Sequence, residues 1–203
     1  MVKTLIQSRF KGEIFAKHAV KELARKLSGN KLCVVSEHRI EWRVKSEKAV
    51  RAKAKISLEE RVRSSLINDF IGIRVLASHM GCLGELEKEI AEWANQIGLV
   101  QVEREDKFEH PDESCYRAIH FDYRFLRSQD WELPSMASVE LQLTTKFQHL
   151  HGDISHRLYH KANSPFTEEV RLFLNNLSNK LHEIDEGVMN FSCHKNSGQC
   201  VKV

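Results

Sequence analysis

Apolar residues recur at helical spacing in four parts of the chain. They predict helices over Ile14–Leu27, Leu83–Ile97, Thr145–Lys161 and Thr167–Met189. Ser28, Gly29 and Asn30 follow the first segment and Gly98 follows the second, and such residues are typical of helix C-termini. We therefore expect helices near both ends of the chain and two more between them.

Six shorter segments are rich in apolar and β-branched residues and predict strands. They are Leu32–Ser36, Ile40–Val44, Leu66–Ala77, Leu99–Glu103, Tyr116–Phe125 and Val139–Thr144. The third segment carries Asp69 and Arg74 within an otherwise apolar run, which indicates a central strand that needs these charges. Strands interleaved with helices predict an α/β or α+β fold, in which a mixed β-sheet is flanked by helices.

Length and composition fit one folded domain. The chain has 203 residues, of which 41% are hydrophobic and 29% are charged, with only 9 Gly and 3 Pro. We expect an N-terminal helix in residues 1–30 and the main domain in residues 31–161. Residues 162–203 are expected to form a C-terminal helix and a polar tail.

No segment predicts a membrane span or an export signal. The chain has no run of about 18 apolar residues, and residues 1–11 carry two lysines and an arginine around a short apolar pair. The five cysteines are scattered, so we expect them to be thiols in a reducing compartment. These features predict a cytoplasmic protein without a membrane partner.

Local charge is more informative than the net charge of +3. Residues 43–63 contain eight Lys or Arg against three Glu, whereas residues 81–113 contain ten acidic residues against three basic ones. The basic segment fits two interpretations, a solvated helix or a surface that binds an RNA backbone.

Alternation along two predicted strands places polar side chains on one face of the sheet. On the last strand, Glu140, Gln142 and Thr144 point away from the apolar residues between them. The polar side of the preceding strand holds Tyr116, Ala118, His120, Asp122 and Arg124. Together these faces predict the floor of a polar cleft.

Asp69 and Glu140 are candidates for a carboxylate pair in this cleft. Two carboxylates from separate strands suit a Mg²⁺ ion that also holds substrate phosphates. Spacing alone leaves an alternative open, in which Asp69 is a cap or turn residue and Glu140 a surface residue of its strand.

Phosphates would have to be bound by side chains, because the motifs G-x-x-x-x-G-K and G-x-G-x-x-G are both absent from the sequence. Arg43 and Lys45 share a strand face, and Lys53 would return to that face two turns along a helix. These cations suit a polyphosphate.

Five blocks of sequence occur in the order and approximate spacing of a known family. They are RVKS from Arg43, DFIGIRV from Asp69, YRAIH from Tyr116, VELQL from Val139, and a helix with Gln148-His149 and HRLYHK from His156. Over about Arg39–Lys161 the chain resembles the RelA/SpoT-type alarmone synthetase domain, found in small single-domain synthetases and toxin-like relatives. The resemblance implies a nucleotidyltransferase-like synthetase fold.

The resemblance also implies a pyrophosphokinase activity. In the implied reaction, the 3′-hydroxyl of GDP or GTP attacks the β-phosphorus of ATP, AMP leaves, and ppGpp or pppGpp forms. Arg43 and Arg74 would hold the adenine of ATP, whereas Lys45 and Lys53 would contact its phosphates. Such a transfer relies mainly on positioning and on neutralising charge.

The metal and acceptor roles follow from the same likeness. Asp69 and Glu140 would hold Mg²⁺, and Glu140 would also assist deprotonation of the attacking hydroxyl. Tyr116 would stack on the acceptor base. His120 would contact the phosphate or ribose of the acceptor, and Gln142 is assigned to the same side.

Departures from the family pattern concentrate on the acceptor side. Ser114-Cys115 stands where Asn-Gly is usual, Asp112 where a lysine is usual, and Thr144 where an arginine is usual. The loss of two cations leaves three functions open. They are synthesis of a guanosine alarmone, pyrophosphorylation of the tRNA 3′ end or an adenosine nucleotide, and nucleotide binding by a catalytically degenerate protein.

The histidines of the predicted helix allow a competing interpretation. His156 and His160 are four residues apart and would share a helix face that suits zinc, although packing or an acceptor-side role explains them equally simply. No His-Asp doublet typical of the family's hydrolase domain occurs, so degradation of the product is not expected. The apolar stripe of Thr167–Met189 fits packing within the chain or a homo-oligomer interface, and an antitoxin partner also stays open.

Overall fold

The computed structural model describes residues 2–28, 39–52, 69–111, 115–134, 137–161 and 167–196. Its helices are α1 (Val2–Gln7), α2 (Arg9–Ser28), α4 (Leu83–Gln96), α5 (Lys146–Lys161) and α6 (Glu168–Asn196), with 3-10 helices η1 (Met80–Cys82) and η2 (Ser128–Trp131). Its strands are β1 (Arg39–Val44), β2 (Ile71–Ala77), β3 (Leu99–Asp106), β4 (Ile119–Phe125) and β5 (Ser138–Thr145). Residues 47–52 form a further helical segment.

The five strands form one sheet in the order β1-β2-β5-β4-β3. Strands β2 and β5 are parallel, whereas the other neighbouring pairs are antiparallel. The sheet is therefore mixed, and the predicted α+β class with helices around a mixed sheet is confirmed.

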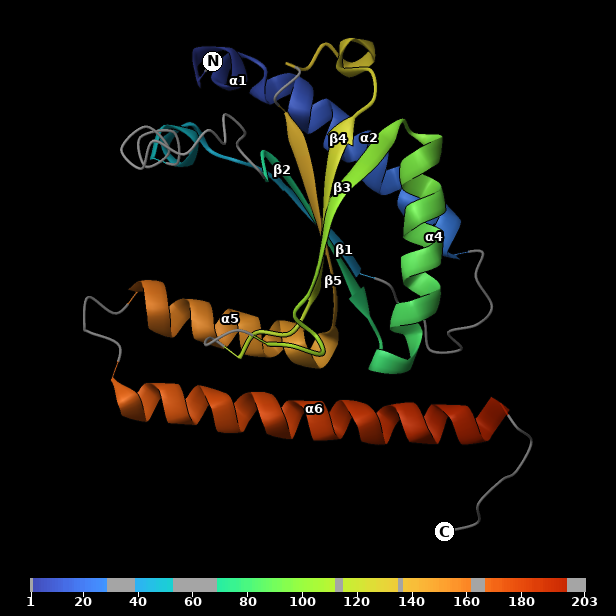
Figure 1. The fold of residues 1–203 in the computed structure, drawn as a ribbon, viewed down its shortest axis with the longest axis vertical. Coiled ribbons are helices and arrows are strands. Elements are labelled where there is room, and N and C mark those ends of the chain that lie inside the picture. Colours follow the sequence, from blue (N-terminus) through green and yellow to red (C-terminus); the bar gives the residue numbers. More distant parts are fainter. Residues whose placement is uncertain are drawn as a thin grey trace.

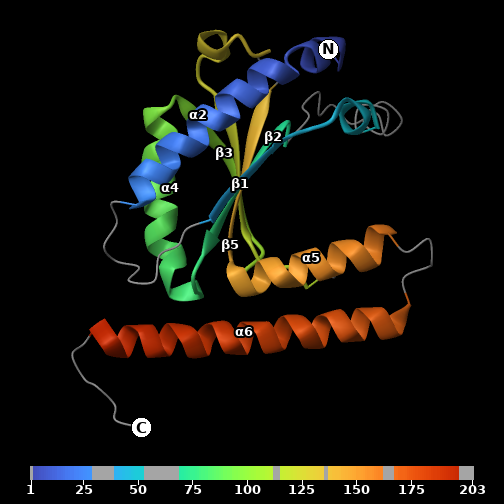
Figure 2. The same ribbon diagram turned by 180° about the vertical axis from the view of Figure 1, so that it is seen from behind.

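Helices α2 and α4 cover one face of the sheet, as Figures 1 and 2 show from opposite sides. The three inner strands β2, β5 and β4 turn their apolar residues toward these helices, because alternate side chains of a strand point to one face. The residues are Ile71, Ile73, Val75, Val139, Leu141, Leu143, Ile119, Phe121 and Tyr123, all of them buried in the core. The opposite face of the same strands is left for polar residues.

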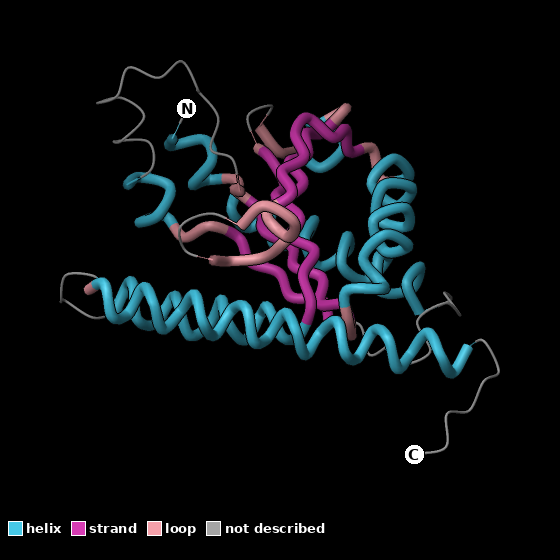
Figure 3. Tube along the Cα trace, turned by 60° about the horizontal axis from the view of Figure 1, so that its bottom comes forward, coloured by secondary structure: helices cyan, strands magenta, loops and turns pink. Residues whose placement is uncertain are grey.

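Helices α5 and α6 lie side by side at the end of the sheet where β5 runs into α5 (Figure 3). Asp185 of α6 is fully buried, and its Oδ1 accepts a hydrogen bond of 2.8 Å from the backbone nitrogen of Met80. Burial raises the pKa of Asp185, against the hydrogen bonds that it receives. This contact ties the 29-residue helix α6 to the segment that follows β2.

The clearest error of the sequence-based prediction is the strand over Leu66–Ala77. Strand β2 begins only at Ile71, and Asp69 lies before it in a turn with a φ of 68°. Asp is one of the few residues that adopts this left-handed conformation readily, because its short polar side chain bonds locally. The proposed strand at Leu32–Ser36 lies outside the described residues.

Two further findings bear on the expected thiols and on the expected lack of a membrane span. Cys82 is disulfide-bonded, so the expectation that all five cysteines are thiols is wrong for this residue. Within the described ranges, no helix is long and apolar enough to cross a bilayer.

Candidate active site

The open face of the sheet carries two parallel rows of side chains that cross all five strands. In the order of the strands, one row is Arg43, Gly72, Glu140, Asp122 and Glu103, and the next is Glu41, Arg74, Gln142, His120 and Glu105. Alternation thus correctly places Glu140, Gln142, His120 and Asp122 on one face. Tyr116 and Ala118 precede β4 instead of lying on it, and Thr144 is fully buried. Arg43 and Arg74 lie on β1 and β2 together with Glu41, whereas from β5 to β3 the charged residues of the two rows are carboxylates and His120.

A cavity of about 200 Å³ opens over the cationic part of this face. Its lining residues come from β1, β2 and β5 and are Glu41, Trp42, Arg43, Gly72, Ile73, Arg74, Glu140 and Gln142. Arg43 reaches into this region across Gly72, where a Cβ atom would stand only 3.2 Å from Cγ and Nε of Arg43. A glycine within a strand marks such a close approach.

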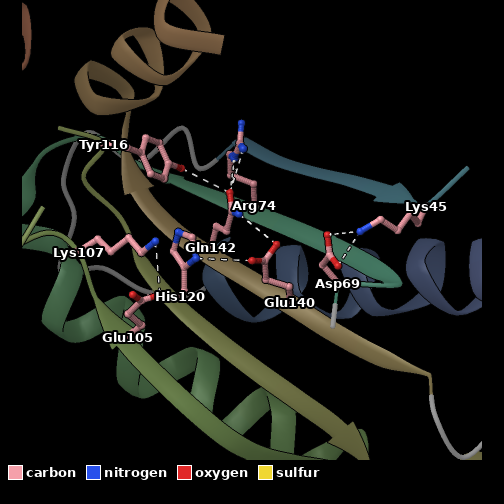
Figure 4. Close-up of polar contacts among 9 residues, drawn as sticks. All are labelled: Lys45, Asp69, Arg74, Glu105, Lys107, Tyr116, His120, Glu140 and Gln142. Atoms are coloured by element: carbon pink, nitrogen blue, oxygen red, sulfur yellow. Dashed lines mark hydrogen bonds and ion pairs between the residues drawn. The ribbon is translucent and has the colours of Figure 1, made fainter. Parts of the chain in front are cut away.

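Gln142 connects the side chains of the site (Figure 4). Its Oε1 accepts hydrogen bonds from Nε and Nη2 of Arg74, at 3.1 and 2.9 Å, and from the Tyr116 hydroxyl at 3.4 Å. Its Nε2 donates to Oε2 of Glu140 at 3.1 Å. Four side chains from three segments, β2, β5 and the loop before β4, are therefore held in one network.

Glu140 is held from its other side by His120. The distance from Nδ1 of His120 to Oε1 of Glu140 is 3.5 Å, and both side chains are more than four-fifths buried. Burial raises the pKa of Glu140, but the hydrogen bond and charge of His120 outweigh it, so the pKa is lowered overall. Glu140 is therefore a fixed carboxylate that favours its ionised form.

Asp69 projects from its turn toward the same face as Glu140 (Figure 4). Its two oxygens accept hydrogen bonds from Nζ of Lys45 at 2.7 and 2.6 Å, and both side chains are mostly buried. The charge of Asp69 raises the pKa of Glu140, against the lowering effects of His120 and Arg43. The turn places Asp69 at the site, although it is not the strand residue that the sequence predicts.

Asp122 adds a third carboxylate beside Glu140, with which it pairs across β4 and β5. Burial raises the pKa of Asp122, and the charges of Glu140, Glu103 and Asp69 raise it further. This part of the face is thus a region of unfavourable negative charge, which a bound cation would relieve.

Tyr116 lies against α5, and Gly152 makes that position possible. A Cβ atom at Gly152 would stand 2.9 Å from Cε2 of Tyr116, closer than real Cβ atoms approach. Burial raises the pKa of the Tyr116 hydroxyl. The edge of its ring faces His120, with the ring centroids 6.0 Å apart.

Two departures from the family pattern have a structural explanation. Cys115, which stands where glycine is usual, has a φ of 57°, a conformation that costs a non-glycine residue about 1 kcal/mol. Thr144, which stands where arginine is usual, is fully buried, and its hydroxyl donates to the carbonyl of Arg117 at 2.8 Å. Neither residue replaces the missing cation.

The remaining candidates are the basic segment, most of which the structure does not describe, and the histidines of α5. Lys53 and most of the basic segment lie outside the described residues. His149 contacts Arg74 at 3.2 Å, whereas the buried His151 bonds to the carbonyl of Leu174 in α6 at 3.1 Å. Among the described residues, no group of three or more His, Cys, Asp or Glu side chains is placed to hold a metal ion by itself.

Sequence reasoning missed the residues that position the site from a distance. Gly152 lies between the two motifs of α5 and Ser178 lies on α6, and their contacts to residues 115–116 span a long stretch of chain. Gly72 carried a usable signal, since a glycine inside an apolar strand indicates close packing.

The face, the cavity and the mixed sheet define a class of protein with a polar site on the open face of an α+β fold. The model of the family described as "Region found in RelA / SpoT proteins" matches residues 42–165. The chain belongs to this family.

Solved structures share the fold at low sequence identity. The small alarmone synthetase 1 from Bacillus subtilis is 21% identical with a TM-score of 0.69, and the match covers 90% of this chain and 94% of that one. The same enzyme bound to its product pppGpp gives 21% identity, a TM-score of 0.65 and coverages of 88% and 93%. A GTP pyrophosphokinase family protein from Streptococcus pneumoniae is 17% identical with a TM-score of 0.68, and the match covers 96% of this chain and 94% of that one. No curated protein matches the sequence.

Proposed function

We propose that the protein is a pyrophosphokinase that transfers the β,γ-pyrophosphate of ATP to the 3′-hydroxyl of GDP or GTP. The oxygen of the hydroxyl forms a bond to the β-phosphorus, the bond from that phosphorus to the bridging oxygen of the α-phosphate breaks, and AMP leaves. The hydroxyl proton passes to a base at the site. The product is a guanosine alarmone, ppGpp or pppGpp.

One observation carries this proposal. The carboxylate of Glu140 is fixed at the centre of the polar face by Gln142 and His120, with cations on one side and an aromatic ring on the other. A carboxylate fixed beside the attacking hydroxyl suits a base that accepts its proton, and here the position of Glu140, whose pKa is lowered, supports the role. Family membership and the fold shared with alarmone synthetases support the same assignment.

The cationic side suits the donor, ATP. Arg43 and Arg74 line the cavity, and a guanidinium stacks well on a purine ring. Lys45, which holds Asp69 with two hydrogen bonds, is proposed to contact the phosphates. Lys53 is proposed as a second phosphate ligand from its place in the family pattern alone.

The carboxylates fit a Mg²⁺ ion. Asp69 and Glu140 are oxygen donors on one face, and a cation between them would offset the effect by which the charge of Asp69 raises the pKa of Glu140. Two carboxylates with substrate phosphates and water are a usual ligand set for this ion. When bound, Mg²⁺ would neutralise and orient the triphosphate.

The acceptor is proposed to bind beside Tyr116 on the carboxylate side. Tyr116 offers a ring for stacking on the guanine base, and His120 and Gln142 lie next to it. The 3′-hydroxyl would then lie near Glu140, which His120 and Gln142 both contact.

A labelling experiment tests the activity and the acceptor together. The full chain is incubated with γ-labelled ATP, Mg²⁺ and, in separate reactions, GDP, GTP, unlabelled ATP or tRNA. We expect label on GDP or GTP together with release of AMP. Label on tRNA or on an adenosine nucleotide would replace the proposed acceptor, and no transfer to any acceptor would overturn the activity.

A further inference from the structure

We infer that Ser178 of α6 is a positioning residue for the proposed acceptor site. Its hydroxyl donates a hydrogen bond of 2.7 Å to the carbonyl of Cys115, the residue before Tyr116. The two residues are 63 positions apart in the sequence, and Ser178 is fully buried. This inference rests on the proposed function, because it assigns Tyr116 to the acceptor.

The bond acts at the point where the backbone is least relaxed. Cys115 has a φ of 57°, which a non-glycine residue adopts only when its surroundings hold it. A direct hydrogen bond to its carbonyl fixes the peptide plane between Cys115 and Tyr116. The direction in which Tyr116 leaves the backbone is set by that plane.

The residues after Cys115 are held by other elements, so that Ser178 completes a clamp on the 115–118 loop. Thr144 of β5 donates to the carbonyl of Arg117 at 2.8 Å, and the backbone nitrogen of Lys107 donates to Ala118 at 3.0 Å. Gly152 of α5 supports the ring of Tyr116 from one side. Among the hydrogen bonds described for this loop, the bond from Ser178 is the one that links its first residue to α6.

Helix α6 is itself anchored, so it is able to serve as a support. Asp185, two turns further along α6, binds the backbone nitrogen of Met80, and His151 of α5 contacts the carbonyl of Leu174 in α6. These contacts tie α6 to the sheet and to α5 on both sides of Ser178. A shift of the 115–118 loop against α6 is therefore opposed by the fold.

The test compares Ser178→Ala with a matched change, Ser155→Ala. Ser155 of α5 is also a buried serine, but its hydroxyl donates to the carbonyl of Gly152 within its own helix at 3.0 Å. Ser178→Thr keeps the hydroxyl and serves as the conservative variant. The readouts are the KM for GDP, the KM for ATP, and amide hydrogen exchange of residues 115–118 followed by mass spectrometry.

For Ser178→Ala we expect the KM for GDP to rise roughly three- to tenfold, the usual effect of one lost hydrogen bond. The KM for ATP should not change, and amide exchange in residues 115–118 should become faster. Ser155→Ala should leave all three readouts near the wild type, and Ser178→Thr should restore the exchange rate.

The inference is overturned if Ser178→Ala matches Ser155→Ala in amide exchange, or if both KM values rise together. Failure of the proposed function has a different signature, since the wild type would then transfer no pyrophosphate. In that case the amide exchange of Ser178→Ala still decides whether α6 holds the loop.

Discussion

The two halves of the polar face differ in charge. The donor half is the part on β1 and β2 that is proposed to bind ATP, and the acceptor half is the part from β5 to β3 that is proposed to bind GDP or GTP beside Tyr116. On the donor half, cations of β1 and β2 border the cavity, and Lys45 neutralises Asp69 with two short contacts. On the acceptor half, Asp122 pairs across the strands with both Glu140 and Glu103, and burial and repulsion raise its pKa. The donor half is thus arranged for a polyanion, whereas the acceptor half is arranged around carboxylates.

The departures from the family pattern lie on the side proposed for the acceptor. The altered acceptor positions are used for packing: Thr144 bonds to Arg117, and Cys115 is held by Ser178. Such contacts stabilise the 115–118 loop that carries Tyr116 without supplying positive charge. Shape and stacking therefore contribute more to acceptor binding in our account than pairing with phosphates does.

Replacement of Glu140, which lies between the two halves, is expected to have the largest effect on activity. Glu140→Gln keeps the size of the side chain but removes the carboxylate that is held by Gln142 and His120. Transfer should fall roughly 10²- to 10⁴-fold, the usual contribution of a positioned base, with an unchanged thermal unfolding temperature. Initial rates of AMP release measure it. Glu105→Gln, a change at the edge of the same face, should retain activity, and equal losses in the two variants would contradict the role of Glu140.

A change on the donor half should separate the two substrates. Lys45→Met removes a cation that is only 16% exposed and leaves the carboxylate of Asp69 without this partner. We expect the KM for ATP to rise roughly 10- to 100-fold, as for a lost charge-assisted hydrogen bond. The KM for GDP should stay the same. Lys88→Met on α4 is the control, and a rise in the KM for GDP alone would reverse our assignment of the two halves.

A smaller effect is expected where α5 meets the acceptor half. Gly152→Ala places a Cβ atom 2.9 Å from the Tyr116 ring, so the ring has to move. The KM for GDP should rise roughly 3- to 10-fold because of this overpacking, with no change for ATP. Gly187→Ala on α6 is a matched control, since nothing lies within 4 Å of its added Cβ atom. An unchanged KM for GDP in Gly152→Ala would show that the position of Tyr116 does not matter.

The smallest effect concerns stability and pH. The pKa of Asp122 is raised in the folded protein, so ionisation of this carboxyl destabilises the fold as pH rises through that pKa. Asp122→Asn should therefore raise the unfolding temperature at neutral pH by up to about 2–4 °C, equivalent to less than about 1 kcal/mol. Calorimetry at pH 4.5 and 7.5 measures the change. The advantage should shrink at the lower pH, and an advantage that grows there would refute the raised pKa.

Much of this arrangement was predictable from local patterns. Alternation in β4 and β5 correctly assigned Glu140, Gln142, His120 and Asp122 to one face, because one side of each strand is buried. Asp69 was assigned to a strand because the residues around it are apolar and β-branched. Its left-handed φ reflects the turn that joins two elements, and apolar periodicity carries no information about that turn.

The contacts that hold the acceptor loop were not predictable in this way. The bond between Ser178 and Cys115 joins residues far apart in sequence, and neither residue has a distinctive neighbourhood. Gly152 is a poor helix former whose use becomes evident only when the Tyr116 ring is placed beside it. Such positions depend on how helices dock on the sheet, which a strand or helix pattern does not specify.

The most direct measurement follows the phosphorus nuclei of ATP by NMR during incubation with GDP and Mg²⁺. Our account predicts that AMP appears in step with a nucleotide that carries a new 3′-pyrophosphate, and that neither forms when GDP is left out. Release of ADP and inorganic phosphate without that product, or AMP formation that does not depend on an acceptor, would contradict it.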